Sequence, residues 1–351
     1  MSQVKTELYP LDEINKDVIT LISSYLDKTD EPQVIKSLRR RHFPLFRTDV
    51  IQTNRILAKL AQYALEGNIV QVANLLNIRP DLRLNVLFTL AGLGAQDEME
   101  LILRQHPEDL LAYRPLRDIS GAVFESISLF KHAIWTKDVF YMANMMLDCL
   151  PQNAWGEEIR LKLVDQYKEL ITNGVVYHLH GIRHENESHF SLQPLITALR
   201  TYQENYKNWT EENKNVHWRT VVGLEQTKLP AHIRHHYCDP EEDFQGTPNF
   251  KKPKLKRSLQ IYIWTENKSQ LWSEAALIGL GKEFGIYGPT PSHSMPWADK
   301  HGVNYNGNLE ALEALDKVRS EVDMPALIER LHTPILNLEA DLSIQGIEFE
   351  S

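Results

Sequence analysis

Histidine and cysteine are concentrated in one short stretch of this 351-residue chain, and together they could bind a metal ion. If the segment AHIRHHYC is helical, His232 and His236 lie four residues apart on one face, a spacing that can chelate zinc. His184 lies in a second histidine-containing segment, and Cys238 or His217 could complete the coordination. We therefore predict His232, His236 and His184 as the metal-ligand candidates.

The same stretch offers a thiol that could act as a nucleophile. Cys238 is preceded by histidines and followed by Asp239, which are the base and orienting groups that such a nucleophile needs. His232, His236 and Cys238 are therefore the catalytic candidates. Against them, close neighbours on a helix point in different directions, and a helix C-terminus disfavours a thiolate. The segment also lacks the glutamate of His-Glu-x-x-His sites, so we expect no cofactor, with zinc as the alternative.

A second group of histidines precedes this stretch. His178 and His180 alternate with apolar residues, so both face one way if the backbone there is extended. His184 follows, with glutamates beside it. These residues and the segment 232–238 would form one site if the fold brings them together. The alternative is that they are surface or hydrogen-bonded histidines without a joint role.

Composition and charge exclude several classes of function. The net charge of −9 argues against a nucleic-acid-binding surface, which would need clustered basic residues. The two cysteines, Cys149 and Cys238, give no disulfide framework and indicate a reducing compartment. Cys149 lies in an apolar segment, where packing explains it. The first residues lack a Sec signal peptide, and no apolar run is long enough to predict a membrane span.

The elements that must position these residues begin with an amphipathic helix predicted at residues 7–27. Its apolar side chains, such as Ile14 and Val18, recur at mostly three- and four-residue spacing. With Tyr9–Pro10–Leu11 at its start, the segment resembles an F-box, the short helical module that docks a protein onto cullin-type ubiquitin ligases. The resemblance implies that residues 1–50 recruit ubiquitin-ligase machinery. The alternative is a helix that packs on the core of the protein itself.

An internal repeat is predicted between residues 54 and 150. Leu60, Leu87 and Phe130 begin three copies of one spacing pattern, in which a tight polar turn joins two helices. Each copy must stack on its neighbours to bury its apolar side. The pattern resembles degenerate ankyrin repeats, which implies a stack of helix pairs in residues 51–172. An ordinary helical bundle with coincidental spacing is the alternative.

Beyond the second copy, the sequence predicts an alternation of helices, turns and one clear strand. The predicted elements are a turn-like insert at 117–121, a helix ending at Asn173–Gly174, a helix from Leu192 to about Trp209, a polar loop from Trp209 to Trp218, a helix after Pro230, a strand at 258–265, a helix near Ser269–Gly279, and two last helices starting at Asn308 and Asp323.

A longer resemblance covers residues 55–335. It rests on FESISLFKHAIWTKDVFYMANMMLDCLP, Trp218–Gly223, Leu229–Pro230–Ala231–His232 and Tyr237–Cys238. This combination resembles uncharacterised proteins of Legionella-type intracellular bacteria, many of them candidates for type IV secretion. The resemblance implies an effector that is made in the bacterial cytoplasm and injected into the host cytosol. The basic run at 251–257 is then a nuclear-import signal or, alternatively, a solvated loop.

The sequence thus predicts a mainly α protein, with ankyrin-like stacked helix pairs followed by a mixed α/β C-terminal region with few strands. The predicted divisions are an F-box-like segment at 1–50, a repeat region at 51–172, a mixed domain at 173–337 and a flexible acidic tail at 338–351. The predicted function is a secreted effector that binds host proteins, with a ubiquitin-ligase adaptor as its more specific form. The alternative is an enzyme that uses the His/Cys cluster, as a metal-dependent hydrolase or a thiol-dependent protein modifier.

Overall fold

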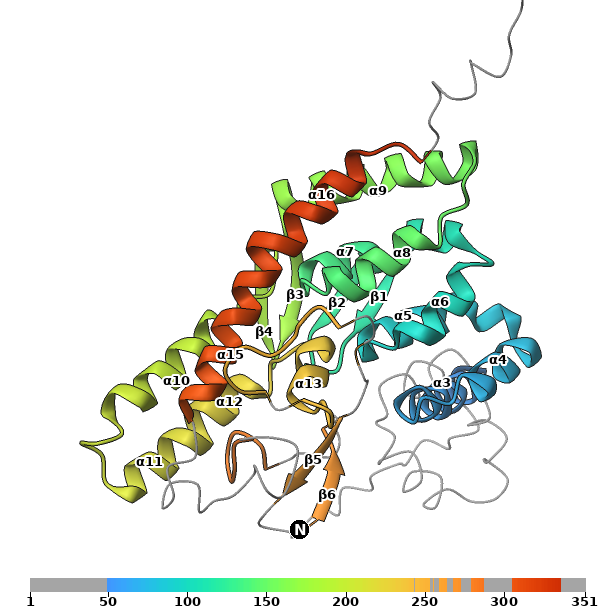
Figure 1. Ribbon diagram of the computed structural model, residues 1–351. Coiled ribbons are helices and arrows are strands. Elements are labelled where there is room, and N and C mark those ends of the chain that lie inside the picture. The colour runs from blue at the N-terminus through green and yellow to red at the C-terminus, as the bar shows by residue number, and fades with distance from the viewer. Residues whose placement is uncertain are drawn as a thin grey trace, which may run out of the picture.

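The computed structural model describes residues 49–335, except for 243, 253–254, 256–258, 264–267, 273–278 and 287–304. Over these residues the protein is mainly helical with few strands, which confirms the predicted fold class (Figure 1). No helix in this described part is both long and apolar enough to cross a membrane. The predicted F-box-like segment lies outside the described range up to residue 48, and the predicted acidic tail lies wholly outside it.

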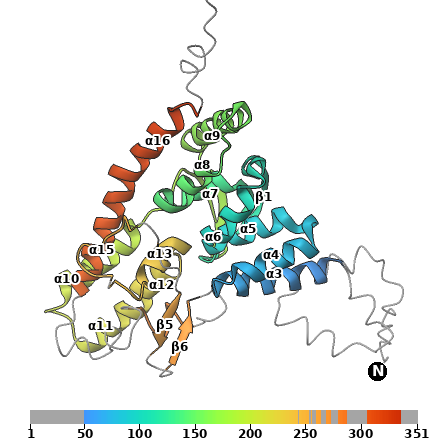
Figure 2. The same ribbon diagram turned by 45° about the vertical axis from the view of Figure 1, so that its right-hand side comes forward.

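Three helix–turn–helix units are described in the region of the predicted repeat. They are α3 (Asp49–Leu65) with α4 (Ile69–Ile78), α5 (Arg83–Leu93) with α6 (Gln96–Leu103), and α7 (Leu129–Trp135) with α8 (Asn144–Asp148). In the third unit a π-helical turn, Val139–Ala143, leads into α8. The first helices α3, α5 and α7 contact one another in sequence, and so do the second helices α4, α6 and α8 (Figure 2). The units therefore form a stack.

The same turn joins the two helices of each unit. Gly67, Gly94 and Lys137 occupy equivalent positions and adopt left-handed backbone conformations, with φ of 67°, 67° and 57°. The N–H of the following residue donates to the carbonyl five residues earlier, at 2.8, 2.9 and 2.9 Å. This is the hydrogen bond that closes a helix C-terminus in a Schellman motif. The repeated spacing in the sequence therefore reflects a repeated backbone turn.

A four-stranded antiparallel sheet interrupts the stack between its second and third units. Its strands, in spatial as well as chain order, are β1 (Tyr113–Arg117), β2 (Val123–Ser128), β3 (Val175–Leu179) and β4 (Ile182–Glu187). The turn-like insert predicted at 117–121 lies at the turn between β1 and β2. The sheet itself was not predicted, because its second hairpin comes from a part of the chain about fifty residues further on.

The two faces of the sheet differ in burial. On one face Phe124 and Tyr177 pack their rings on Trp135 of α7, with ring centroids 4.9 and 4.7 Å apart. The other face carries a cross-strand row in which Val123 pairs with Arg117 on one side and with His178 on the other. Arg117 and Val123 are solvent-exposed, whereas His178 is partly buried. The sheet thus buries an aromatic face and presents a mixed polar face.

The remaining helices and strands follow the sheet. They are α9 (Ala154–Asn173), α10 (Gln193–Asn205), α11 (Glu211–His217), α12 (Gly223–Gln226), α13 (Ala231–Tyr237), β5 (Gln260–Ile263), β6 (Lys268–Leu271), α15 (Tyr305–Val318) and α16 (Met324–His332). The helix end predicted at Asn173–Gly174 is confirmed, since Gly174 caps α9 with a left-handed φ of 64°. The strand predicted at 258–265 contains β5.

Two sequence predictions in this half are wrong. The polar loop expected between Trp209 and Trp218 is α11, because the Thr210 side chain caps this helix by accepting from the Asn213 N–H at 3.2 Å. The helix expected from Ser269 begins instead as β6, which pairs with β5 along its length. The cap stabilises the first segment as a helix despite its polar composition, and pairing with β5 holds the second segment as a strand. The rest of that expected helix, 273–278, lies outside the described residues.

The C-terminal helices are tied to the third unit of the stack. Arg319, in the π-helical turn between α15 and α16, is buried. Its guanidinium donates to the carbonyls of Thr136 and Lys137, the latter at 3.1 Å from Nε. These two carbonyls belong to the turn of the third unit, so a distant arginine completes that turn. Burial lowers the pKa of Arg319 to about 10, which leaves it charged at neutral pH.

Candidate functional site

The predicted catalytic and metal-binding helix, α13, lies in the interior of the protein. All of its residues are buried, including His232 and His236, and Cys238 directly after it is 1% exposed. Pro230, predicted as the first helical residue, is the N-cap residue immediately before the helix. The histidine-rich segment is therefore helical as predicted. Its histidines lie in the core and not on a solvent-facing surface.

His236 is held between aromatic rings as a neutral side chain. Its ring centroid lies 5.2 Å from that of Phe250 and 6.1 Å from that of Tyr141. Burial, reinforced by the neighbouring His235, lowers the pKa of His236 to about 3. The imidazole is therefore uncharged at neutral pH. The Nε2 atom of His235 lies 3.4 Å from the carbonyl oxygen of Leu93 at the end of α5.

Both thiols are buried and protonated at neutral pH. Burial raises the pKa of Cys238 strongly, although the nearby Arg234 opposes this shift. Burial likewise raises the pKa of Cys149 to about 12. The Cys149 Sγ atom lies 3.7 Å from the Met145 sulfur, which agrees with the packing role predicted for it. A nucleophilic thiolate at Cys238 would need a polar environment that this position lacks.

The other predicted ligands lie on different elements. His184, on β4, stacks on Tyr177 at a centroid distance of 4.7 Å and contacts Glu187 through Nδ1 at 3.1 Å. His217, at the end of α11, contacts the Ala198 carbonyl through Nε2 at 2.9 Å. Within the described residues, no group of three or more His, Cys, Asp or Glu side chains is arranged to hold a metal ion. His184 and the two α13 histidines therefore do not form such a group.

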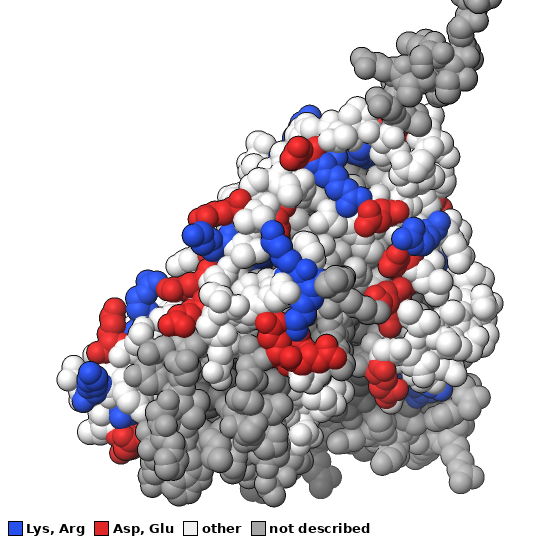
Figure 3. All heavy atoms as spheres, viewed as in Figure 1, with Lys and Arg blue, Asp and Glu red and all other residues white. Residues whose placement is uncertain are grey.

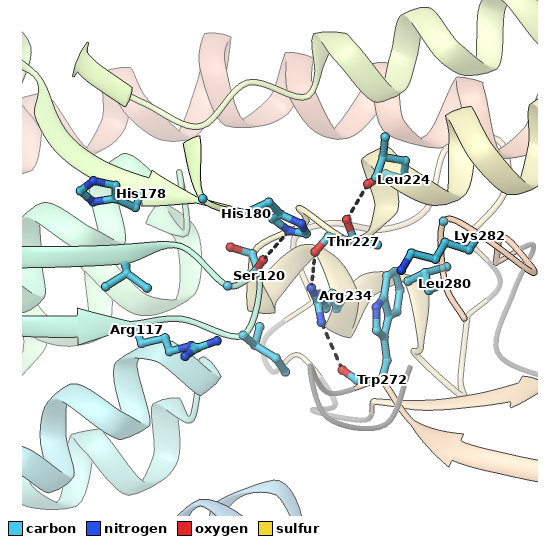
Figure 4. A pocket seen from close by; sticks show the side chains of 15 residues that line it. Arg117, Ser120, His178, His180, Leu224, Thr227, Arg234, Trp272, Leu280 and Lys282 are labelled. Carbon is cyan, nitrogen blue, oxygen red and sulfur yellow. Dashed lines mark hydrogen bonds between the residues drawn. The ribbon is translucent and has the colours of Figure 1, made fainter. Parts of the chain in front are cut away.

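A cavity of about 490 Å³ lies beside α13, at the turn end of the sheet (Figure 4). Turns of the sheet, helices α12 and α13, and the segment around β6 line it. Its lining residues are Arg117, Ile119, Ser120, Gly121, Val123, His178, His180, Gly181, Leu224, Thr227, Arg234, Trp272, Leu280, Gly281 and Lys282. His178, which the sequence singled out, is among them, whereas His184, His232, His236 and Cys238 are not. The predicted residues therefore do not converge on this cavity.

Three turns that meet at the cavity each contain a glycine with left-handed backbone. Gly121, Gly181 and Gly281 have φ of 85°, 81° and 80°. The turn between β3 and β4 also places His180 at a positive φ of 51°. A two-residue hairpin turn of this kind needs positive φ at both positions, which explains the glycine beside the histidine. The turns bring residues about sixty and one hundred positions apart in the sequence to one wall.

A hydrogen-bond network fixes the first of these turns. The Asp118 carboxylate accepts from the Ser120 N–H at 2.8 Å, from the Ser120 hydroxyl and from the Ala122 N–H at 3.2 Å. Its second oxygen lies 3.6 Å from Nε2 of His132. The Ser120 carbonyl in turn contacts His180 Nε2 at 3.3 Å, which links the two sheet turns. This wall of the cavity is therefore preorganised.

Arg234 forms the opposite wall from within α13. Its guanidinium donates to the carbonyls of Leu229 and Thr227, each at 2.8 Å, and to that of Trp272 at 3.4 Å. It also lies over the Trp272 ring, 5.0 Å from the centroid. Arg234 is 2% exposed, so a positive charge is held in the interior by carbonyl oxygens and an aromatic face. These contacts fasten α13 to its neighbours.

Sequence reasoning missed most of the residues that line the cavity. Arg234 lies midway between His232 and His236, so on a helix it points away from the face that the histidines share. The sequence therefore pointed to the helix that lines the cavity, but the predicted residues lie on the helix face that does not line it. Trp272 and Lys282 carry no local signal, because only the packing of β6 and the following turn brings them to α13. The insert at 117–121 and His178 were among the features singled out in the sequence that proved to line the cavity on its sheet side.

Comparisons with known proteins support a family relationship. Residues 194–331 match the model of the CBUA0006 C-terminal domain, a range that contains α11, α12, α13 and α15 and most of α10 and α16. An uncharacterised protein of Coxiella burnetii (strain RSA 493 / Nine Mile phase I), CBUA0006, is 30% identical over 256 residues, which cover 69% of this chain and 73% of that protein. No solved structure matches the chain.

Proposed function

Because the chain belongs to the family of the Coxiella burnetii protein CBUA0006, we propose that it is a secreted bacterial effector that acts by binding a host protein. The family relationship is compatible with an uncharacterised effector family. The protein would be made in the bacterial cytoplasm and act in the host cytosol, with import into the nucleus if the basic run at 251–257 serves as a signal. Four residues of that run lie outside the described part of the chain.

The observation that carries the proposal is the solvent-facing surface of α4. Val70 and Ile78 expose 64% and 73% of their surface, among the most exposed large apolar residues described. The exposed residues between them are amides, namely Gln71, Asn74 and Asn77. The helix sequence IVQVANLLNI contains no charged residue. Depletion of charge around exposed apolar side chains is the composition of a protein–protein interface core.

The position of α4 in the stack makes this surface available. Among the described residues, α4 belongs to the first unit of the stack and packs on α3 and α6, with Val72 fully buried on its inner side. In a stack of repeats, the terminal unit has a neighbour on only one side and normally ends in a polar surface. Here the outer surface of α4 carries no charge and exposes Val70 and Ile78 with amide side chains between them. Figure 3 shows charged side chains of both signs over much of the molecule but mostly uncharged surface over α4.

A partner for this surface would offer an apolar, uncharged patch of its own. A highly charged partner would lose hydration of its charges without gaining an ion pair on α4. We therefore assign the host partner to the class of proteins with an exposed apolar groove or helix face. The proposal includes the predicted likeness of the stack to ankyrin repeats, because repeat stacks of that kind present extended surfaces to partner proteins.

Recruitment of ubiquitin-ligase machinery by residues 1–50 is the more specific form of the proposal. Two surfaces would then act together, with α4 holding the target and the N-terminal segment holding the ligase. The enzyme alternative is less well supported, because Cys238, His232 and His236 are buried and the first is held as a thiol.

The test compares two double variants in host cells. Val70→Asp with Ile78→Asp places charges on α4, whereas Leu161→Asp with Ile171→Asp places them on α9, where these residues are 51% and 49% exposed. A partner recovered with the full-length protein is purified and titrated against each variant. The α4 variant is expected to bind at least about tenfold more weakly, and the α9 variant to bind unchanged.

Three outcomes would overturn the proposal. Equal loss in both double variants would show a general effect of added charge. Unchanged affinity in the α4 variant would remove α4 from the interface. Loss of partner binding after deletion of residues 1–48 would place the interface on that segment and not on α4. Absence of secretion in a type IV translocation assay would separately remove the effector assignment.

A further inference from the structure

The cavity beside α13 presents hydrogen-bond donors and positive charge, and the binding function proposed above does not use it. Arg117 and Lys282 are exposed at its wall, and Arg234 is buried in it. Among its described lining residues none is aspartate or glutamate. Figure 4 shows Arg117, His180 and Arg234 around one space. Such a wall stabilises an anion. We propose that this cavity binds a small molecule that carries a phosphate group.

An unused donor in the wall supports a ligand rich in acceptor oxygens. Trp272 is 1% exposed, and its indole Nε1–H has no hydrogen-bond partner in the described structure. A buried indole N–H normally finds an acceptor, because leaving it without one costs free energy. The carbonyl of the same residue is occupied by Arg234. A phosphate oxygen in the cavity would supply the acceptor that the protein does not provide.

Phosphate fits this wall better than a carboxylate does. A phosphate group carries close to two negative charges at neutral pH and three acceptor oxygens, so donors can approach it from several directions. Donor side chains line the cavity from three segments, namely Arg117 at the end of β1, Trp272 after β6 and Lys282 beside Gly281. A carboxylate has one charge in one plane and would leave part of this set unused.

The size and the remaining lining point to an organic phosphate. A volume of about 490 Å³ lies in the usual range of small-molecule sites and exceeds what an inorganic ion would fill. Ile119, Val123, Leu224 and Leu280 contribute apolar surface that a carbon skeleton can contact. At Gly181 an added Cβ would meet nothing within 4 Å, so the space above this turn is open. The fixed turns lower the cost of binding because little has to be ordered.

The experiment uses the full-length protein and calorimetric titration at low and moderate salt. The probes are inorganic pyrophosphate and glucose 6-phosphate, with glucose and citrate as the neutral and carboxylate controls. Binding of both phosphates, weaker at higher salt, and much weaker binding of glucose and citrate are expected. Lys282→Ala and Arg117→Gln are each expected to weaken pyrophosphate binding about tenfold. Lys168→Ala, which removes an exposed positive charge outside the cavity lining, is the matched control and should bind as the unaltered protein does.

A second measurement keeps the proposal testable if a variant folds poorly. The indole ¹H–¹⁵N resonance of Trp272 is assigned by its loss in Trp272→Phe, which keeps the aromatic ring and removes the donor. Pyrophosphate should shift this resonance downfield in the unaltered protein. No shift at saturation, equal binding by Lys282→Ala and Lys168→Ala, or equal affinity for glucose and glucose 6-phosphate would each overturn the proposal. Binding to phosphatidic acid vesicles without binding to soluble pyrophosphate would also overturn it, because the ligand would then be a membrane surface.

Discussion

Helices α4 and α13 reverse the usual relation between side-chain polarity and burial. α4 is apolar and uncharged in sequence, yet Val70 and Ile78 face solvent. α13 reads AHIRHHY, yet all of it is buried. The difference arises from position: α4 belongs to the first unit of the stack within the described residues, whereas α13 lies between the sheet turns, the stack and the segment after β6. Polarity at α13 is tolerated because Arg234 is bonded to three carbonyls and His236 is neutral.

The largest effect is expected from removing the charged anchor of α13. Arg234→Met leaves the carbonyls of Leu229, Thr227 and Trp272 without this donor, and we expect a loss of about 3–5 kcal/mol in the free energy of unfolding. Arg200→Met is the control, since Arg200 is half exposed and pairs with Glu313 at the surface. Its expected loss is below about 1 kcal/mol. Urea denaturation measures both, and equal losses would contradict the role of burial.

A smaller effect is expected from protonation of the neutral histidine in α13. The pKa of His236 is about 3 in the folded protein and near 6.5 in the unfolded chain, so the unfolded chain binds a proton first as the pH falls. His236 therefore favours folding above pH 6.5, and this contribution is lost on acidification between 6.5 and 3, at roughly 1.4 kcal/mol per pH unit.

The His236 contribution is measured as the slope of unfolding free energy between pH 6.5 and pH 5. His236→Leu keeps a buried apolar side chain and should lower this slope by about one bound proton. His184→Gln is the control, because His184 is partly exposed on β4. An unchanged slope in His236→Leu would mean that another group controls the acid sensitivity of this region.

The smallest effects are expected within α4 and separate its two sides. Val72→Ala removes buried methyl groups and should cost about 1–3 kcal/mol, whereas Val70→Ala should change stability by less than about 0.5 kcal/mol. The two positions share residue type, helix and substitution, so thermal unfolding reports burial alone. If Val70→Ala cost as much as Val72→Ala, the outer side of α4 would be covered in the isolated protein.

The same contrast shows what the sequence could and could not reveal. The stack was predictable in outline because its turns need a left-handed residue at a fixed place, and Gly67 and Gly94 supply it. The helical state of α13 was predictable from Pro230 and the residues after it. Its burial was not, because a polar composition normally indicates an exposed helix and the compensating carbonyls come from other segments.

The cavity was beyond sequence reasoning for a different reason. Ser120, His180 and Lys282 meet there through three turns whose mutual position depends on strand pairing and on the packing of β6. Each turn has a recognisable glycine, but nothing local relates one turn to another. The register of β2 against β3 rests on a pairing between Val123 and His178, which lie in separate hairpins. Only the assembled sheet places them together.

The contact of Arg319 with the turn at Thr136 and Lys137 has a consequence for synthesis on the ribosome. The Lys137 carbonyl and its donor are 182 residues apart in the chain. At about 5–20 residues per second, the arginine is made roughly 10 to 40 seconds after the turn that it completes. The nascent stack must therefore spend that interval with these carbonyls hydrated, and its third unit reaches its final form only when the C-terminal helices have been translated.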